Sequence, residues 1–223
     1  IDSYDSTDYT VGAKSVHNQT TGGKTRTHAI FGQWGWDFAP QWDVAVGARY
    51  EQWQTYDGFY YKHKTAALLD FEDRDATGFS PKFSLGFKPA EAWQLRYSIG
   101  RAYRFPIVEE LFSNEEKINS STIANAHLRP EVGIHHNFMV ERLIANGFVR
   151  ANLFHENVKD AIWSQTDVIN SVSTFLPVDK VRTTGLELVL QQNRVFALPV
   201  DLNANITWTD SKIVKNSADP STE

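Results

Sequence analysis

Histidine is the side chain in this sequence best suited to binding a metal ion, and its spacing limits what it could do. The chain has seven histidines, including the adjacent pair His135 and His136. Neighbouring residues of a strand point to opposite faces, so this pair cannot hold one ion from one side. His63 has no second ligand at a spacing that would complete a site. We therefore predict no metal site, and interpret the histidines as polar or interfacial residues.

Carboxylates form the other groups with chemical potential. The pairs Glu109-Glu110 and Glu115-Glu116 could serve general acid–base catalysis, but the sequence supplies no nucleophile or cofactor site to go with them. A third acidic group could bind calcium and consists of Asp70, Glu72, Asp73 and Asp75. We favour a solvated loop, because the segment lacks the glycine and the distal glutamate of a helix-loop-helix calcium site. We predict that the chain is not an enzyme and uses no cofactor.

The elements that carry these residues show a period of two, which predicts strands. In the first clear hairpin, Trp34, Trp36 and Phe38 alternate with polar or small residues, and Ala39-Pro40-Gln41 forms the turn. The faces of residues 148–157 stay undecided, because Ala151 and Leu153 compete with Phe148 and Phe154. Further strands are predicted at 42–50, 79–88, 93–100, 132–140, 185–190 and 202–208, and a weaker one at Tyr9–Lys14.

The connections alternate between short turns and long polar segments. We predict a loop at 20–25 (TTGGKT), another from the aromatic run Trp53–Tyr61 to about Gly78, and a polar stretch at 164–175. Tryptophan and phenylalanine gather beside the short turn at 39–41, as in the interfacial girdle of a membrane barrel. Short turns at one end and long loops at the other are typical of outer-membrane barrels.

Composition restricts the class of protein further. Mean hydropathy is negative at −0.41 although the chain has 7 Trp, 8 Tyr and 14 Phe. A membrane β-barrel fits this profile, since every second residue of a strand faces water. The absence of cysteine excludes disulfides and thiolate ligands. A net charge of −5 without a basic block makes nucleic acid an improbable class of partner, and we predict none.

Two segments carry a resemblance to a known family. Tyr103-Arg104-Phe105-Pro106 with EELF at 109–112 is followed by LRPE at 128–131, and the stretches at 151–165, 178–191 and 205–213 fit the same pattern. The chain resembles the TonB-dependent receptors of the bacterial outer membrane, whose barrels have about 22 strands and an N-terminal plug. The resemblance implies an all-β fold, an antiparallel meander that forms a partial transmembrane β-barrel of about nine strands.

The same resemblance implies the function. Residues 1–223 are expected to be a partial barrel domain that lacks the plug and the closing strands. Such a receptor lies in outer-membrane lipid and takes up a scarce ligand, most often a ferric siderophore and otherwise haem, cobalamin or a glycan. The TonB complex supplies energy through the absent plug.

Two groups of residues are candidates for contact with the ligand or plug. Aromatic and hydroxyl groups can hold a bulky chelate by stacking and hydrogen bonding, which makes an aromatic segment with one arginine the candidate ligand site: Trp53, Tyr56, Tyr60, Tyr61 and Arg101. An upper aromatic girdle is the competing interpretation of this segment. The candidates for the lumen wall, which bridge strands or hold the plug, are Arg49, Arg96, Glu141 and Glu187.

Two other functions stay open on the sequence alone. A passive porin shares the alternation, although the YRFP and LRPE segments are not expected in it. A soluble β-sandwich, such as a carbohydrate-binding module, would bury its apolar strand faces against a second layer. Packing of Trp34, Leu95, Phe138 and Leu188 against another sheet or helix of the chain would favour the sandwich.

Overall fold

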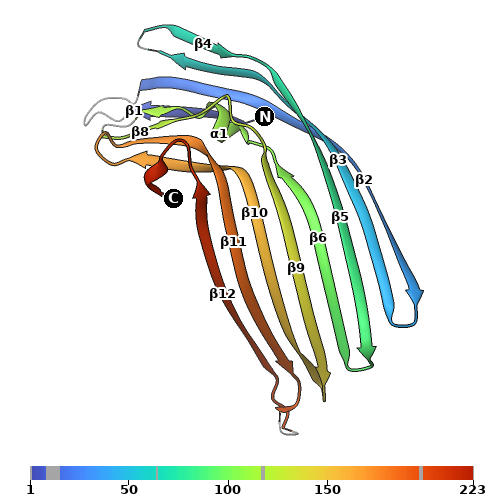
Figure 1. The fold of residues 1–223 in the computed structure, drawn as a ribbon. Helices are drawn as coiled ribbons and strands as arrows, with labels where there is room; N and C mark the ends of the chain where they lie inside the picture. Colours follow the sequence, from blue (N-terminus) through green and yellow to red (C-terminus); the bar gives the residue numbers. More distant parts are fainter. Residues whose placement is uncertain (1, 9–15, 64, 117–118, 196–197, 223) are drawn as a thin grey trace.

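The chain folds into one strongly curved sheet in which neighbouring long strands run antiparallel (Figure 1). The computed structural model describes residues 2–8, 16–63, 65–116, 119–195 and 198–222. Within them, nine strands follow one another as a meander: β1 (Asp2–Asp8), β2 (Val16–Ala39), β3 (Trp42–Lys62), β5 (Arg74–Ala90), β6 (Trp93–Arg104), β9 (Glu131–Ile144), β10 (Gly147–Asp167), β11 (Val172–Gln192) and β12 (Leu202–Lys215). The predicted all-β meander of about nine strands is confirmed.

Several short elements lie at one end of the sheet. β4 (Ala67–Phe71) pairs with β3, and β7 (Glu115–Glu116) pairs with β8 (Ser121–Ile123). β8 also pairs with β11, in parallel, outside the antiparallel meander. The helix α1 (Val108–Phe112) lies at the same end, opposite the short turns, and a 3-10 turn covers Pro220–Thr222. No pairing in the described part of the chain joins β12 to β1 or β2, so the sheet is not closed.

The register settles which side chains share a face. Leu153 pairs with Phe138 and Leu186, whereas Phe154 pairs with Asn137 and Gly185. The faces of residues 148–157, which the sequence left undecided, therefore follow Ala151 and Leu153 on the apolar side. A side chain at Gly185 would collide with the Phe154 ring, so the glycine makes room for an aromatic residue on the polar side.

The apolar face is uncovered. Trp34 is 56%, Phe138 42% and Leu188 44% exposed, and Leu95 lies among them on the same face in register with Val140. None of these four belongs to a buried cluster of the described chain. The arrangement is the one expected of strands that face lipid, and it argues against the two-layer sandwich. No helix in the described residues is both long and apolar enough to cross a membrane.

The opposite face holds the buried core. A cluster forms where α1 packs against the strands, and it contains Trp53, Val108, Leu111, Phe112, Leu128 and Ile162. Trp53 belongs to β3 and Ile162 to β10, four strand spacings apart along the sheet. Both can reach one helix only because the sheet curves toward it, since adjacent strands lie about 4.8 Å apart. The polar face is therefore the concave one.

Two predicted loops are wrong. Residues 20–25 lie within β2, and the segment from Trp53 to Gly78 is mostly β3, β4 and β5. The polar stretch at 164–175 belongs largely to β10 and β11. Polar residues and glycines hid these strand extensions, which continue past the apolar band and are held by backbone pairing to neighbouring strands. The strand predicted at Tyr9–Lys14 lies outside the described residues.

Candidate functional site

Ion pairs line the concave face of the sheet. Arg96 on β6 donates to Asp43 on β3 over 2.7 Å and to the Ser84 hydroxyl on β5 over 3.0 Å. Arg150 on β10 binds Glu141 on β9 through Nε at 2.8 Å and Nη2 at 2.5 Å. These partners come from different strands, so each ion pair links two strands of the sheet. Such bonding satisfies charged groups while leaving a polar lining.

Two other candidates for the wall behave differently. Arg49 donates to Glu51 over 2.9 Å, but both belong to β3, so this pair bridges no neighbouring strand. Glu187 pairs in register with Asn152 and Thr207, and within the described residues its side chain forms no hydrogen bond or ion pair. Arg49, Arg96, Glu141 and Glu187 share the concave face by register, and their contact with a plug stays a prediction.

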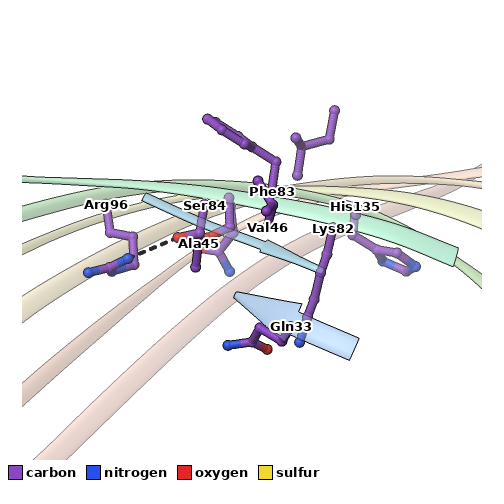
Figure 2. A pocket seen from close by; sticks show the side chains of 12 residues that line it. Gln33, Ala45, Val46, Lys82, Phe83, Ser84, Arg96 and His135 are labelled. Carbon is purple, nitrogen blue, oxygen red and sulfur yellow. Dashed lines mark hydrogen bonds between the residues drawn. The ribbon is translucent and has the colours of Figure 1, made fainter. Parts of the chain in front are cut away.

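The concave face is hollowed beside Arg96 (Figure 2). The recess has a volume of about 410 Å³ and is lined from β2, β3, β5, β6 and β9. Its lining combines apolar residues, such as Val46, Phe83 and Ile99, with polar ones: Gln33, Lys82, Ser84, Arg96, Ser98, His135 and Asn137. Figure 2 shows Val46 and Phe83 on the other side of the sheet from Lys82 and Arg96. The lining offers hydrogen-bond donors and positive charge, and it contains no aspartate or glutamate.

The two adjacent histidines lie on opposite faces. His135 Nδ1 is 2.7 Å from Glu156 on the concave side, whereas His136 Nδ1 is 2.8 Å from the Tyr97 hydroxyl on the apolar side. The described residues contain no group of three or more histidine, aspartate or glutamate side chains placed to hold a metal ion.

The aromatic candidates for ligand binding do not form one surface. Trp53 is 2% exposed and stacks on Phe105 at 5.9 Å between ring centroids, so its ring offers no free surface to a ligand. A β-bulge in β3 separates the other aromatic candidates, because it inverts the alternation of side chains after Tyr56. Asp57, with φ of 53°, lies in this bulge.

Beyond the bulge the tyrosines separate. Tyr56 lies under Arg26, whose Nη2 donates to its hydroxyl over 3.2 Å, with Lys24 also over the ring. Tyr60 instead donates to Gln19 over 3.0 Å, and Gln19 donates to the backbone of Asn114 beside α1. Tyr61 contacts His63 edge to face at 4.8 Å. The structure thus divides these side chains between two faces.

Arg101 is also apart from Arg96. It pairs in register with Ile134, which is exposed on the apolar side, so strand alternation gives the two arginines opposite faces. The Arg101 guanidinium lies 4.7 Å from the centre of the Tyr103 ring. A role in ligand binding stays a prediction for Arg101 and for the three half-buried tyrosines Tyr56, Tyr60 and Tyr61.

Sequence reasoning overlooked a network that fixes the described residues between β6 and β9, 105–116 and 119–130, hereafter the insert. Arg104 donates to Glu110 over 2.9 Å and to Glu131 over 2.7 Å, and Glu131 also accepts from the Ile162 backbone over 2.7 Å. Arg74 donates to the carbonyls of Ala126 and Leu128 at the far end. The YRFP, EELF and LRPE segments supply this network, so the motif itself was the available signal.

The family of the chain follows from comparison with known proteins. A sequence model described as "TonB dependent receptor-like, beta-barrel" matches residues 1–223. The chain belongs to this family. A search of curated proteins found no match. Membership places the chain in a family of receptors, and the open curved sheet is one part of the wall of a TonB-dependent receptor barrel.

Solved structures share the fold of this TonB-dependent receptor barrel at low identity. The copper transporter OprC matches with a TM-score of 0.71 and 17% identity, over 95% of this chain and 34% of that one. The ferric yersiniabactin uptake receptor FyuA from Yersinia pestis matches at 0.65 and 14%, over 96% and 31%. The siderophore receptor PiuA from Acinetobacter baumannii matches at 0.66 and 16%, over 94% and 28%. This chain therefore spans about a third of their length.

Proposed function

We propose that the chain is part of the barrel wall of an outer-membrane receptor that actively takes up a scarce ligand, most simply a ferric siderophore. The TonB complex energises this uptake through a plug domain carried by the rest of the receptor. Residues 1–223 form a partial barrel domain in this proposal, with the plug and the closing strands outside them.

The observation that carries this proposal is the contrast between the two faces of one sheet. Large apolar residues are exposed along the convex face, while cross-strand ion pairs and the side chains of Lys82 and Arg96 occupy the concave face. A wall with hydrocarbon outside and water inside needs this contrast. The neighbours named for siderophore uptake, FyuA and PiuA, support iron chelates as the class of ligand.

The insert distinguishes this receptor from an open pore. It crosses the concave side at the end opposite the short turns, where it binds β2, β5 and β11 through Thr21, Arg74 and Phe175. A segment fixed across the lumen narrows the path beside the wall. This arrangement favours a receptor that captures its ligand over a passive channel.

Uptake by whole cells tests the proposal. A deletion strain that carries the full-length receptor is supplied with a panel of radiolabelled ferric siderophores, each with and without a protonophore. We expect saturable uptake of at least one chelate, lost when the proton gradient is dissipated. Uptake that rises linearly with concentration and ignores the protonophore would instead establish a passive channel. A strain that lacks the receptor and takes up every chelate equally well would exclude iron transport.

A further inference from the structure

Lys82 is an exposed residue of the recess lining and lies between two glycines. On β5 it pairs with Gly47 of β3 and Gly100 of β6. A Cβ at Gly47 would lie only 2.8 Å from Lys82 Cε and 3.3 Å from Cγ. The glycine therefore leaves space for the aliphatic stem of Lys82 to lie along the wall. Figure 2 shows this stem extending past the sheet toward Gln33.

The charge balance of the recess singles out the same residue. Arg96 is paired with Asp43 at 2.7 Å, and His135 is held by Glu156 at 2.7 Å. No carboxylate of the described chain forms an ion pair with Lys82, and none lines the recess. A hollow of about 410 Å³ thus carries one unneutralised ammonium group. A concave wall of one charge sign concentrates counter-ions.

We propose that this recess is an anion site, in which Lys82 binds a carboxylate or a similar oxyanion. Lysine suits this task as a compact charge with three donors, and the amides of Gln33 and Asn137 in the same lining are neutral donors for the remaining oxygen lone pairs. The proposal rests on the proposed function, because it takes the concave face to be the lumen of a receptor. It adds that the lumen selects for negative charge.

The anion has two sources with the same chemistry. It is either an acidic group of the transported solute or a carboxylate of another segment of the receptor. A neutral solute gains little from Lys82, and a bare metal cation is repelled by the positive lining. The experiment below separates the two sources.

Lysine reactivity in the purified full-length receptor tests the site directly. Reductive methylation followed by mass spectrometry measures how fast each amine reacts, with citrate, inorganic phosphate or sodium chloride added at equal ionic strength. A bound anion raises the amine pKa, so half a pKa unit slows labelling by about threefold. Lys88 is the internal control, because it lies on the same strand but lines a different hollow with Asp37 and Asp43.

Each outcome decides the matter. Slow labelling of Lys82 without additives, relieved by high salt, means that the receptor supplies the anion. Slowing by citrate or phosphate but not by chloride means that the solute supplies it. Labelling of Lys82 as fast as Lys88 throughout, or slow labelling that no salt relieves, would overturn the site. Slow labelling that no salt relieves indicates that the amine is sterically covered and not held by a charge.

Two variants connect the site with transport. Lys82→Arg keeps the charge and is expected to retain capture of an anionic chelate, whereas Lys82→Gln is expected to weaken capture of that chelate by about threefold or more. Equal capture by Lys82→Gln and the unaltered receptor, for anionic and neutral chelates alike, would count against the site. Labelling does not require uptake, so loss of the transport proposal alone would leave the labelling result readable.

Discussion

The ring of Phe112 occupies the space that a side chain at Gly58 would need. A Cβ built there would lie 2.5 Å from Phe112 Cε1 and 2.6 Å from Cζ, and Gly23 faces the same ring. Phe112 is 2% exposed and its helix belongs to the insert, while Gly58 follows the bulge in β3. The bulge and the two glycines together form the seat of the insert.

Gly58→Ala is therefore expected to destabilise the receptor by about 1–3 kcal/mol, because an added methyl group overpacks the seat. Thermal unfolding of the full-length receptor in detergent measures the change, and limited proteolysis reports release of the insert. Gly32→Ala is the matched control, since nothing lies within 4 Å of a Cβ at that position of β2. Equal melting temperatures of the two variants would contradict the close packing of Phe112 against Gly58.

Glu131, at the start of β9 beside the insert, is expected to fasten this strand to β6 and β10 through two bonds. Glu131→Ala removes the acceptor for Arg104 and for the Ile162 backbone, whose distances are both 2.7 Å, and should cost about 1–3 kcal/mol. Glu131→Gln keeps an oxygen for the Ile162 amide and should lose less. Hydrogen exchange at Ile162 checks this order. Faster exchange in the glutamine variant than in the alanine variant would contradict it.

Alternation was enough to predict most of the wall. It predicted the sheet, the faces of Trp34, Leu95 and Leu188, and the concave placement of Arg96, because register is fixed wherever one face is apolar. The prediction failed where the contrast between an apolar and a polar strand face ends. Residues beyond the apolar band no longer alternate between an apolar and a polar face, so residues 20–25 of β2 and the end of β3 looked like loops although backbone pairing extends both strands.

The candidate ligand site was harder to predict, for a physical reason. A single bulge near Asp57 inverts the side-chain order, so Trp53 and Tyr60 point to one side and Tyr56 to the other. Burial of Trp53 depends on Leu111 and Leu128, which are more than fifty residues away in the sequence. Neither effect leaves a local pattern.

Acidity should loosen the tip of the β10–β11 hairpin. Asp167 accepts from the side chain of Asn170 and from the backbones of Asn170 and Ile169, which lowers its pKa below the ordinary 3.8. Because the pKa of Asp167 is lowered in the folded state, the ionised carboxylate stabilises the turn fully above pH 3.8. This stabilisation is lost as the pH falls through the pKa of the folded state. Protection of the Ile169 amide, corrected for intrinsic exchange, is the measurement. Asp167→Asn should show no such step, and the same step in that variant would refute the assignment.

Adjacent residues of β10 provide the sharpest test of which face meets lipid. Leu153 is 50% exposed between Phe138 and Leu186, whereas Asn152 lies on the concave side beside Glu187. An arginine on a lipid-facing position near the midplane costs about 2–4 kcal/mol, while a lumen position tolerates it. Leu153→Arg should therefore reduce assembly of the full-length receptor, measured as the folded fraction that resists unfolding in SDS without heating. Asn152→Arg should assemble normally, because its guanidinium gains water and the Glu187 carboxylate. If Asn152→Arg were the more damaging of the two, the faces would be reversed and the proposed lumen would be wrong.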